Sequence, residues 1–351
     1  MKYLIVQDWQ NTHDNHAGMV HMCRLLCQKY PEKYTMLVKD CPSPMPKRNR
    51  ITARLIGWYD RKIYRKKFVQ EYMELCQPMF EKLKVGDEVF LLEYHWPSTS
   101  QLELAQYIRA NFPGMKINAL SHLTPTWYGK IRGSEKMILD WEAYIDKQLT
   151  LGSSLTQYFY SLGIHQNKIS TGFHYVDRDY YDAKEIVKHE IPTVITMGAL
   201  QRDFSLMVEI VKGCPDVNWI ICKGRKNVDD MFAGLSNVEL KGFLTEDELR
   251  HQMSRADISL NVLEDTVGSN VITTSMAMGL AIVVSNVGSI HDYCSDRNAL
   301  FCENNSKSFI DAVNRLAKDE ELLFSMRKNA YRKSCDFRIE NVDIWFNHIY
   351  K

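Results

Sequence analysis

The segment from Glu264 to Ser289 holds the residues best suited to chemistry, because a Gly-Ser-Asn turn stands directly ahead of a helical pattern. The first amides of a helix have no partner within it and carry the positive end of its dipole, which favours an anion there. Gly268, Ser269 and Asn270 form the turn, with Asn270 as a candidate N-cap or ligand donor and Val271 next in the helix. An ordinary strand-loop-helix unit without a ligand is the alternative. The pattern predicts a site for a phosphate-sized group.

The elements that position this turn alternate regularly between strands and helices from Thr193 onward. Thr245 and Glu248 form a capping box, which marks the start of one of these helices. In this half strands are predicted at 193–198, 219–222, 238–242, 258–262 and 281–284, and helices at 204–212 and 245–256. Apolar strands separated by helices are typical of a parallel sheet, whose ligands lie at the carboxyl ends of the strands.

The first half shows a similar α/β alternation. Strands are predicted at 1–6, 35–38, 88–95 and 116–122, with a helix at 19–29. Beyond Phe301 the pattern is helical, with a helix capped at Ser306, a second one through Ala330 and a last segment from 339 to 351. The first strand begins at residue one without a charged region and apolar stretch before it, so no secretory signal is expected.

Several positions of the second half occur in an order that is characteristic of one enzyme group. Gly198 closes the first strand, Arg202 follows it in GALQRD, Gly224 ends the second strand in ICKG, and Gly242 stands in NVELKG. The segment SNVITTSMAMGLAIVVSNVGS comes next. In this order the second half resembles the nucleotide-sugar domain of GT-B glycosyltransferases, in particular the retaining glycosyltransferase family 4.

This resemblance implies an α/β fold of the GT-B class, with two Rossmann-like domains facing across a cleft. Residues 1–175 would form the acceptor domain and residues 176–335 the nucleotide-sugar donor domain. Residues 336–351 would form a helix that crosses back onto the first domain, with the crossing at 335–338.

The resemblance also assigns roles to individual residues. Arg202, His122 and Glu264 are the implied catalytic residues. The implied donor-binding residues are His16, Gly18, Gly198, Lys223, Gly224, Gly242, Phe243, Gly268, Ser269, Asn270, Val271 and Thr274. Two positions depart from the family, because Thr274 replaces the glutamate that usually holds the ribose and Ala199 replaces a frequent arginine. Glu264 supplies the first carboxylate only if its loop is longer than usual.

No metal or other cofactor is expected. Histidines gather at predicted strand ends, but none is paired with a second histidine and cysteines at zinc-site spacing. Asp177-Arg178-Asp179 matches the manganese-binding DxD pattern of another glycosyltransferase fold, but it lies between the two halves. A solvated turn with Arg178 in a salt bridge is the preferred interpretation, and Arg202 with the helix amides would neutralise the diphosphate.

Composition and charge limit the class of protein. The chain has 351 residues with 45% hydrophobic residues, enough for two cores, and its nine cysteines are scattered as in a reduced cytosolic protein. The net charge is +1, yet nine basic residues and one acid lie between Lys47 and Lys67. This segment suits an anionic membrane or a lipid-linked acceptor, a solvated basic helix being the alternative, and no nucleic acid is expected. Its candidate contacts are Arg50, Arg54, Trp58, Arg61, Arg65 and Lys66.

The predicted function is transfer of a sugar, with retention and without metal, from a nucleoside diphosphate donor to a glycan or lipid-linked acceptor. The donor is expected to be UDP-linked. The protein is expected in the cytoplasm, peripheral at the inner membrane face, in polysaccharide biosynthesis. Two alternatives remain open: a catalytically silent nucleotide-sugar-binding subunit, and a nucleotide-sugar epimerase of similar fold.

Overall fold

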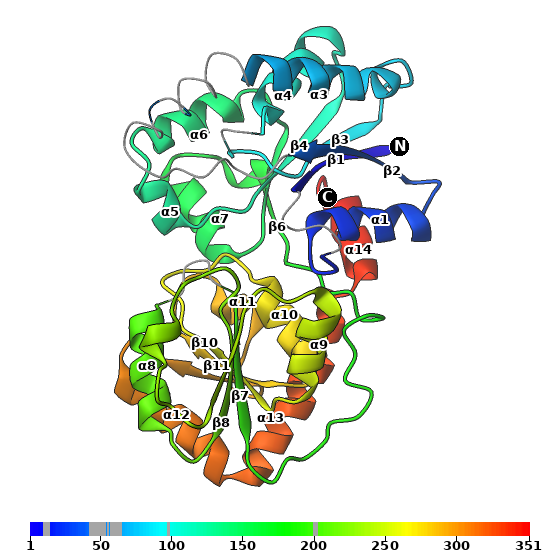
Figure 1. The fold of residues 1–351 in the computed structure, drawn as a ribbon. Helices are drawn as coiled ribbons and strands as arrows, with labels where there is room; N and C mark the ends of the chain where they lie inside the picture. Colours follow the sequence, from blue (N-terminus) through cyan, green and yellow to red (C-terminus); the bar gives the residue numbers. More distant parts are fainter. Residues whose placement is uncertain (10–14, 42–53, 55, 57–64, 97–98, 199–202) are drawn as a thin grey trace. The chain divides into compact units, whose positions relative to one another are not determined.

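The computed structural model describes residues 1–9, 15–41, 54, 56, 65–96, 99–198 and 203–351. The chain forms two compact units. Unit 1 comprises residues 1–151, 156–172 and 349–351, and unit 2 comprises residues 152–155 and 173–348. Each unit is built on a six-stranded sheet flanked by helices (Figure 1).

The sheet of unit 1 is parallel, with strand order β2-β1-β3-β4-β5-β6. Its strands are β1 (Lys2–Trp9), β2 (Tyr34–Cys41), β3 (Glu88–Leu91), β4 (Lys116–Ser121), β5 (Lys147–Thr150) and β6 (Ile169–Thr171). Its helices are α1 (Met19–Lys29), α3 (Arg65–Phe80), α4 (Gln101–Asn111), α5 (Pro125–Gly129), α6 (Ser134–Glu142) and α7 (Ser153–Ser161), whose first residues belong to unit 2. The chain runs outward in opposite directions from β1 and β3, so a crevice opens at their carboxyl ends.

The sheet of unit 2 is also parallel, with strand order β12-β11-β10-β7-β8-β9. Its strands are β7 (Thr193–Met197), β8 (Asn218–Cys222), β9 (Val238–Lys241), β10 (Ile258–Asn261), β11 (Ala281–Ser285) and β12 (Ala299–Cys302). Its helices are α8 (Phe204–Gly213), α9 (Glu246–Ser254), α10 (Asn270–Ala277), α11 (Ile290–Tyr293), α12 (Ser306–Lys318), α13 (Glu320–Lys333) and α14 (Ile339–His348). β7 and β10 lie side by side at the equivalent switch point.

The apolar strands form the core that their sequence predicts. All five residues of β7, and all five of β11, are buried, and Trp219 of β8 is 1% exposed. Burial on both faces explains why these strands are nearly continuous apolar runs instead of alternating patterns. Among the described helices, none combines the length and the apolar character needed to cross a membrane.

The helix starts show where the local sequence is sufficient to predict the structure. The capping box of Thr245 and Glu248 is present, and the Thr245 amide donates to Glu248 Oε2 over 2.8 Å. Two predicted caps were wrong by one residue. Ser269, not Asn270, is the N-cap of α10, and Asn305, not Ser306, caps α12 by accepting from the Ser308 amide. Ser269 and Asn305 have extended backbones, as an N-cap requires, whereas their successors begin the helices.

The end of the chain contributes to both units. Contacts place α14 in unit 2 and residues 349–351 in unit 1. In unit 1, the Tyr350 hydroxyl donates to Asn118 Oδ1 over 2.7 Å, and Lys116 Nζ lies 4.0 Å from the Tyr350 ring centroid. The Tyr350 side chain is therefore anchored to β4.

Candidate functional site

The loops at the switch point of unit 2 carry the residues predicted to bind an anion. Glu264 is exposed in the loop that follows β10, and Gly198 is exposed directly after β7. Arg202 and Ala199 lie outside the described residues. α8 follows β7 and α10 follows β10, so the amino ends of both helices lie at this edge of the sheet.

The start of α10 lacks the side-chain cap that four other helices of unit 2 have. Side chains cap α8, α9, α12 and α13, namely Asp203, Thr245, Asn305 and Asp319. Ser269 at the start of α10 makes no such side-chain bond. The Ile272 and Thr273 amides donate to Ser269 O over 3.1 and 3.2 Å, while within the described chain the Asn270 and Val271 amides have no partner. Two helix-end donors are left for an anion.

The loop before α10 is held tightly against the loop after β11. The Ser289 amide donates to Thr266 O over 2.8 Å. Gly288 has a φ of 56°, and a Cβ there would lie 2.1 Å from Thr266 O, so any other residue would push the loops apart. Ser289 Oγ in turn accepts from the Ser154 amide over 2.9 Å. The turn ahead of α10 therefore has a rigid support.

One predicted residue of this region, Thr274, forms a different contact from the one that the resemblance implies. Thr274 is buried, and its hydroxyl donates to Asn270 O of its own helix over 2.7 Å. A threonine often satisfies its hydroxyl in this way within a helix. The described contacts therefore give Thr274 a structural bond in the place where the resemblance implied a ribose contact.

The loops after β8 and β9 carry four of the predicted donor residues. Gly224 and Gly242 lie in these loops, and Gly224 has a φ of 59°. Lys223 Nζ is paired with Asp229 Oδ1 at 2.7 Å. Phe243 is 59% exposed, with the Arg225 guanidinium 4.7 Å from its ring centroid. Arg225 was not predicted, and an exposed ring paired with a cation is a surface on which a flat group can stack.

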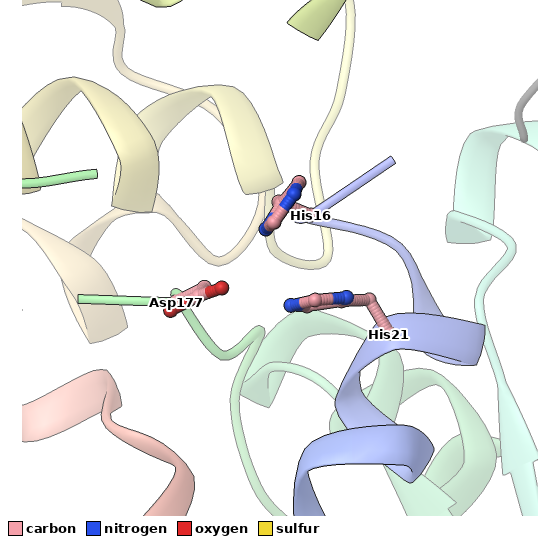
Figure 2. Close-up of side chains that lie close together, drawn as sticks. All are labelled: His16, His21 and Asp177. Carbon is pink, nitrogen blue, oxygen red and sulfur yellow. The ribbon is translucent and has the colours of Figure 1, made fainter. Parts of the chain in front are cut away.

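A cavity of about 100 Å³ lies at the switch point of unit 1, between the carboxyl end of β1 and the start of α1. It is lined by Gln7, Asp8, Trp9, Asn15, Gly18, Met19, Val20, His21, Arg24 and Glu93. Gly18 is the N-cap of α1 and provides no side-chain bond. His16 adjoins this loop, and its ring lies 4.2 Å from that of His21, centroid to centroid (Figure 2).

Glu93 is one of the residues of this cavity that sequence reasoning missed, because it lay inside the predicted strand 88–95. The strand β3 ends at Leu91, and the chain turns from Leu92 onward. Burial raises the pKa of the Glu93 carboxyl, while the charge of His122 acts in the opposite direction. A carboxyl group in a cavity with a raised pKa is a candidate for binding or proton transfer.

His122 lies directly after β4, as predicted, and its Nε2 donates to Leu92 O over 2.6 Å. Its neighbour Ser121 is buried and contacts a second histidine, with His95 Nδ1 and Ser121 Oγ 2.6 Å apart. Burial lowers the pKa of His95 to about 3, so its ring is neutral. His122 is thus held at the carboxyl edge of the sheet next to a buried polar group.

The Asp177-Arg178-Asp179 turn is less solvated than predicted. Asp177, in unit 2, is 7% exposed and accepts from the amides of Asp179 and Tyr180 (labelled in Figure 2). Arg178 forms the predicted salt bridge, here with Asp182 at 3.7 Å, and donates to Tyr331 O. The Asp177 carboxylate closes the turn through these two bonds.

The remaining predictions concern the basic segment and the cysteines. Arg54, Arg65 and Lys66 are exposed, and Arg65 pairs with Glu103 at 2.5 Å. Arg50, Trp58 and Arg61 lie outside the described residues. All nine cysteines are free thiols. Burial raises the pKa of Cys222 to about 12, which makes it a poor nucleophile.

A family model matches most of the second unit, and solved structures resemble the fold of the whole chain. Residues 192–319 match the family model Glycosyl transferases group 1. No curated protein matches the sequence. A glycosyltransferase from Rickettsia africae is 12% identical, with 100% of this chain and 99% of that one covered and a TM-score of 0.66.

Two further structures extend this likeness. Sucrose-phosphate synthase from Thermosynechococcus elongatus is 12% identical, with 100% of this chain and 98% of that one covered and a TM-score of 0.73. HepE from Anabaena, solved with UDP and glucose, is also 12% identical, with 99% and 98% covered and a TM-score of 0.70. At these identities the similarity concerns the fold, and it extends over both units.

Proposed function

We propose that this chain, a glycosyltransferase of the GT-B fold by the group 1 domain of its second unit and by its architecture, transfers a hexose from a UDP-sugar to a hydroxyl of a glycan or lipid-linked acceptor. The observation that carries this proposal is the uncapped start of α10, where the Asn270 and Val271 amides lie at the switch point of unit 2. Uncapped helix amides favour a phosphate group. HepE, of the same fold, was solved with UDP.

The mechanism follows from the charges that develop during transfer. Cleavage of the bond between the anomeric carbon and phosphate leaves negative charge on the departing diphosphate and positive character on the sugar ring. The α10 amides and Arg202 stabilise the diphosphate, and they do so without a metal ion. Loss of one such preorganised donor typically costs roughly 3 kcal/mol, or about a hundredfold in rate. Retention of anomeric configuration is part of the proposal through the family resemblance.

On the acceptor side, residues 1–175 serve as acceptor domain, 176–335 as donor domain, and 336–351 as the helix that returns to the first. His122 lies at the carboxyl edge of the unit 1 sheet and contacts the donor sugar. The basic segment, with exposed Arg54, Arg65 and Lys66, supports a role at the anionic inner face of a membrane in polysaccharide biosynthesis. If the protein does not float with anionic liposomes at low salt, the proposed role at a membrane is contradicted.

The test combines binding with turnover. Calorimetry with UDP, GDP, ADP and TDP should detect binding of UDP most strongly, and it should do so in EDTA. Incubation with UDP-glucose, UDP-galactose and UDP-N-acetylglucosamine should then release free sugar slowly, as transferases do when water replaces the acceptor. The proposal is contradicted if no nucleoside diphosphate gives a heat of binding. Its metal-independent mechanism is contradicted if binding requires a divalent ion.

One observation favours a second candidate, a nucleotide-sugar-binding subunit without activity. The Thr274 hydroxyl is bonded to its own helix at Asn270 O, so the carboxylate that usually holds the ribose has no counterpart there. The same experiments separate the two candidates. Tight UDP binding without release of sugar from any donor identifies the silent subunit.

A further inference from the structure

The described residues that line the cavity of unit 1 all belong to that unit, so its chemistry can be considered independently of unit 2. It opens at the switch point of β1 and β3, the place in a parallel sheet where ligands bind. The start of α1 borders it, and Gly18 leaves that helix without a side-chain cap. A helix start alone does not identify a ligand, and the side chains around it decide which group fits.

Gln7 gives the independent indication that a ligand belongs there. Its side chain lines the cavity and is 2% exposed. The amide nitrogen Nε2 donates to Thr99 O over 2.7 Å, whereas Oε1 has no hydrogen-bond partner within the described chain. A buried carbonyl oxygen left unpaired costs about 1–3 kcal/mol. A hydroxyl donated by a ligand would remove this cost.

The remaining polar groups of the cavity are of both signs. Asp8 and Glu93 supply carboxylates, which accept hydrogen bonds, while Arg24 supplies only donors. Asn15 Oδ1 accepts from the Ala17 amide over 2.9 Å, which directs its Nδ2 to other acceptors. The ring of Trp9 adds a flat apolar surface. Few polar groups around an aromatic side chain are typical of a small-molecule site.

This set of groups discriminates between classes of ligand. A phosphate or carboxylate would approach the two carboxylates of Asp8 and Glu93, and like charges across a contact are costly. A cation would approach Arg24. An uncharged polyhydroxyl compound meets neither penalty, because each hydroxyl both donates and accepts. Its hydroxyls can donate to Gln7 Oε1 and to the carboxylates, and its apolar face can lie on Trp9.

We propose that this cavity binds a neutral sugar residue of the acceptor, and that Gln7, Asp8 and Glu93 reject acceptors whose terminal sugar is anionic. The role of this sugar as an acceptor rests on the proposed transferase function, whereas binding of the sugar to the cavity does not depend on turnover.

The test measures binding of matched small glycosides by saturation-transfer NMR. The neutral probes are the methyl glycosides of glucose, galactose, mannose and N-acetylglucosamine, and the anionic probes are those of glucuronic and galacturonic acid. The wild-type chain should bind at least one neutral glycoside, and its acidic counterpart at least tenfold more weakly. Glu93→Gln removes the charge at nearly constant shape and should reduce this preference at least tenfold. Glu32→Gln is the matched control, since Glu32 is exposed beyond the far end of α1.

Each outcome decides the question. No binding of any neutral glycoside, equal binding of the acidic ones, or an unchanged preference in Glu93→Gln overturns the inference. Asp8→Asn serves as second variant if Glu93→Gln does not fold, as judged by its thermal unfolding. UDP calorimetry on the same samples tests the transferase proposal separately. Bound UDP with no bound glycoside therefore removes only the cavity's role, and bound glycoside without UDP removes only the donor site.

Discussion

His95 lies in an environment very different from that of an ordinary side chain in water. It is fully buried among Trp141, Tyr128 and Phe159, whose ring centroids lie 5.7, 6.1 and 5.7 Å from its own. Its φ of 45° is in the left-handed region, and within the described chain its Nε2 has no partner. An uncharged ring is the form that this apolar setting permits.

The lowered pKa of His95 predicts a pH dependence of stability. The folded pKa is about 3 and the unfolded value is near 6.5, so below pH 6.5 the unfolded chain binds the proton first. Stability is therefore unaffected by this group above pH 6.5 and falls as the pH decreases toward 3. Between pH 7.5 and pH 5.0 the loss from this group should be about 2 kcal/mol.

Urea unfolding of the wild-type chain and of His95→Asn at the two pH values measures this effect. Asparagine tolerates the left-handed backbone and does not titrate. The variant should be less stable at pH 7.5, because it loses ring contacts, but should lose about 2 kcal/mol less between the two pH values. Equal losses in both proteins would mean that His95 is protonated when folded.

For single residues, the sequence predicts the place along a strand better than it predicts the surroundings of the side chain. His122 was placed at the end of a strand, where it lies, because polar residues after apolar runs mark that point. The burial of His95 depends on Trp141 and Phe159, which are distant in sequence, and no local pattern contains that information. Glu93 was missed for a related reason, since β3 ends at Leu91 and the turn that aims Glu93 into the cavity follows.

At the scale of elements, α10 begins without a side-chain cap, at the place where the proposed function puts the diphosphate. A side chain that capped it would stabilise the helix and compete with a diphosphate. Ser269→Asp should therefore raise the free energy of unfolding by about 0.5–1 kcal/mol through capping and the helix dipole. The same carboxylate should weaken UDP binding at least tenfold through repulsion.

Calorimetry with UDP and urea unfolding of Ser269→Asp together check this prediction. Ser236→Asp is the control, because Ser236 is exposed and precedes β9, at the opposite edge of the sheet. The control should bind UDP as the wild-type chain does. If Ser269→Asp keeps its affinity for UDP, the start of α10 does not hold the diphosphate.

Helix starts also show which elements a sequence specifies. Thr245 and Glu248 form their bonds within four residues, so the local sequence was sufficient to predict this helix start. At α10, Ser269 and Asn270 are both good N-cap residues, and composition alone did not distinguish them. The structure decides in favour of Ser269, whose backbone is extended.

At the scale of the whole molecule, the alternation of strands and helices predicted two α/β units, whereas the path of the chain between them was not predictable. Residues 152–155 belong to unit 2 because Ser153 Oγ donates to Asp292 Oδ1 over 2.8 Å and the Ser154 amide donates to Ser289 Oγ. These partners lie 139 and 135 residues further along the chain. Pairings over such distances leave no trace in the local pattern.

The proposed roles of the two units predict where each ligand slows amide exchange in the complete chain. UDP should protect the Asn270 and Val271 amides of unit 2, which have no partner in the described chain, because the diphosphate accepts their hydrogen bonds. A neutral methyl glycoside should protect Met19 and Val20 of unit 1 instead. Hydrogen exchange with mass spectrometry measures both, at a ligand concentration of about 100 times Kd, where binding adds about 2.7 kcal/mol.

Uridine provides the control for this experiment, since it has the base and ribose of UDP without the diphosphate. It should leave exchange at the start of α10 unchanged, even at saturation. Protection by uridine equal to that by UDP would assign the site to the nucleoside and not to the phosphates. Protection of Met19 and Val20 by UDP, and not by uridine, would favour a diphosphate site in unit 1, because the start of α1 has no side-chain cap.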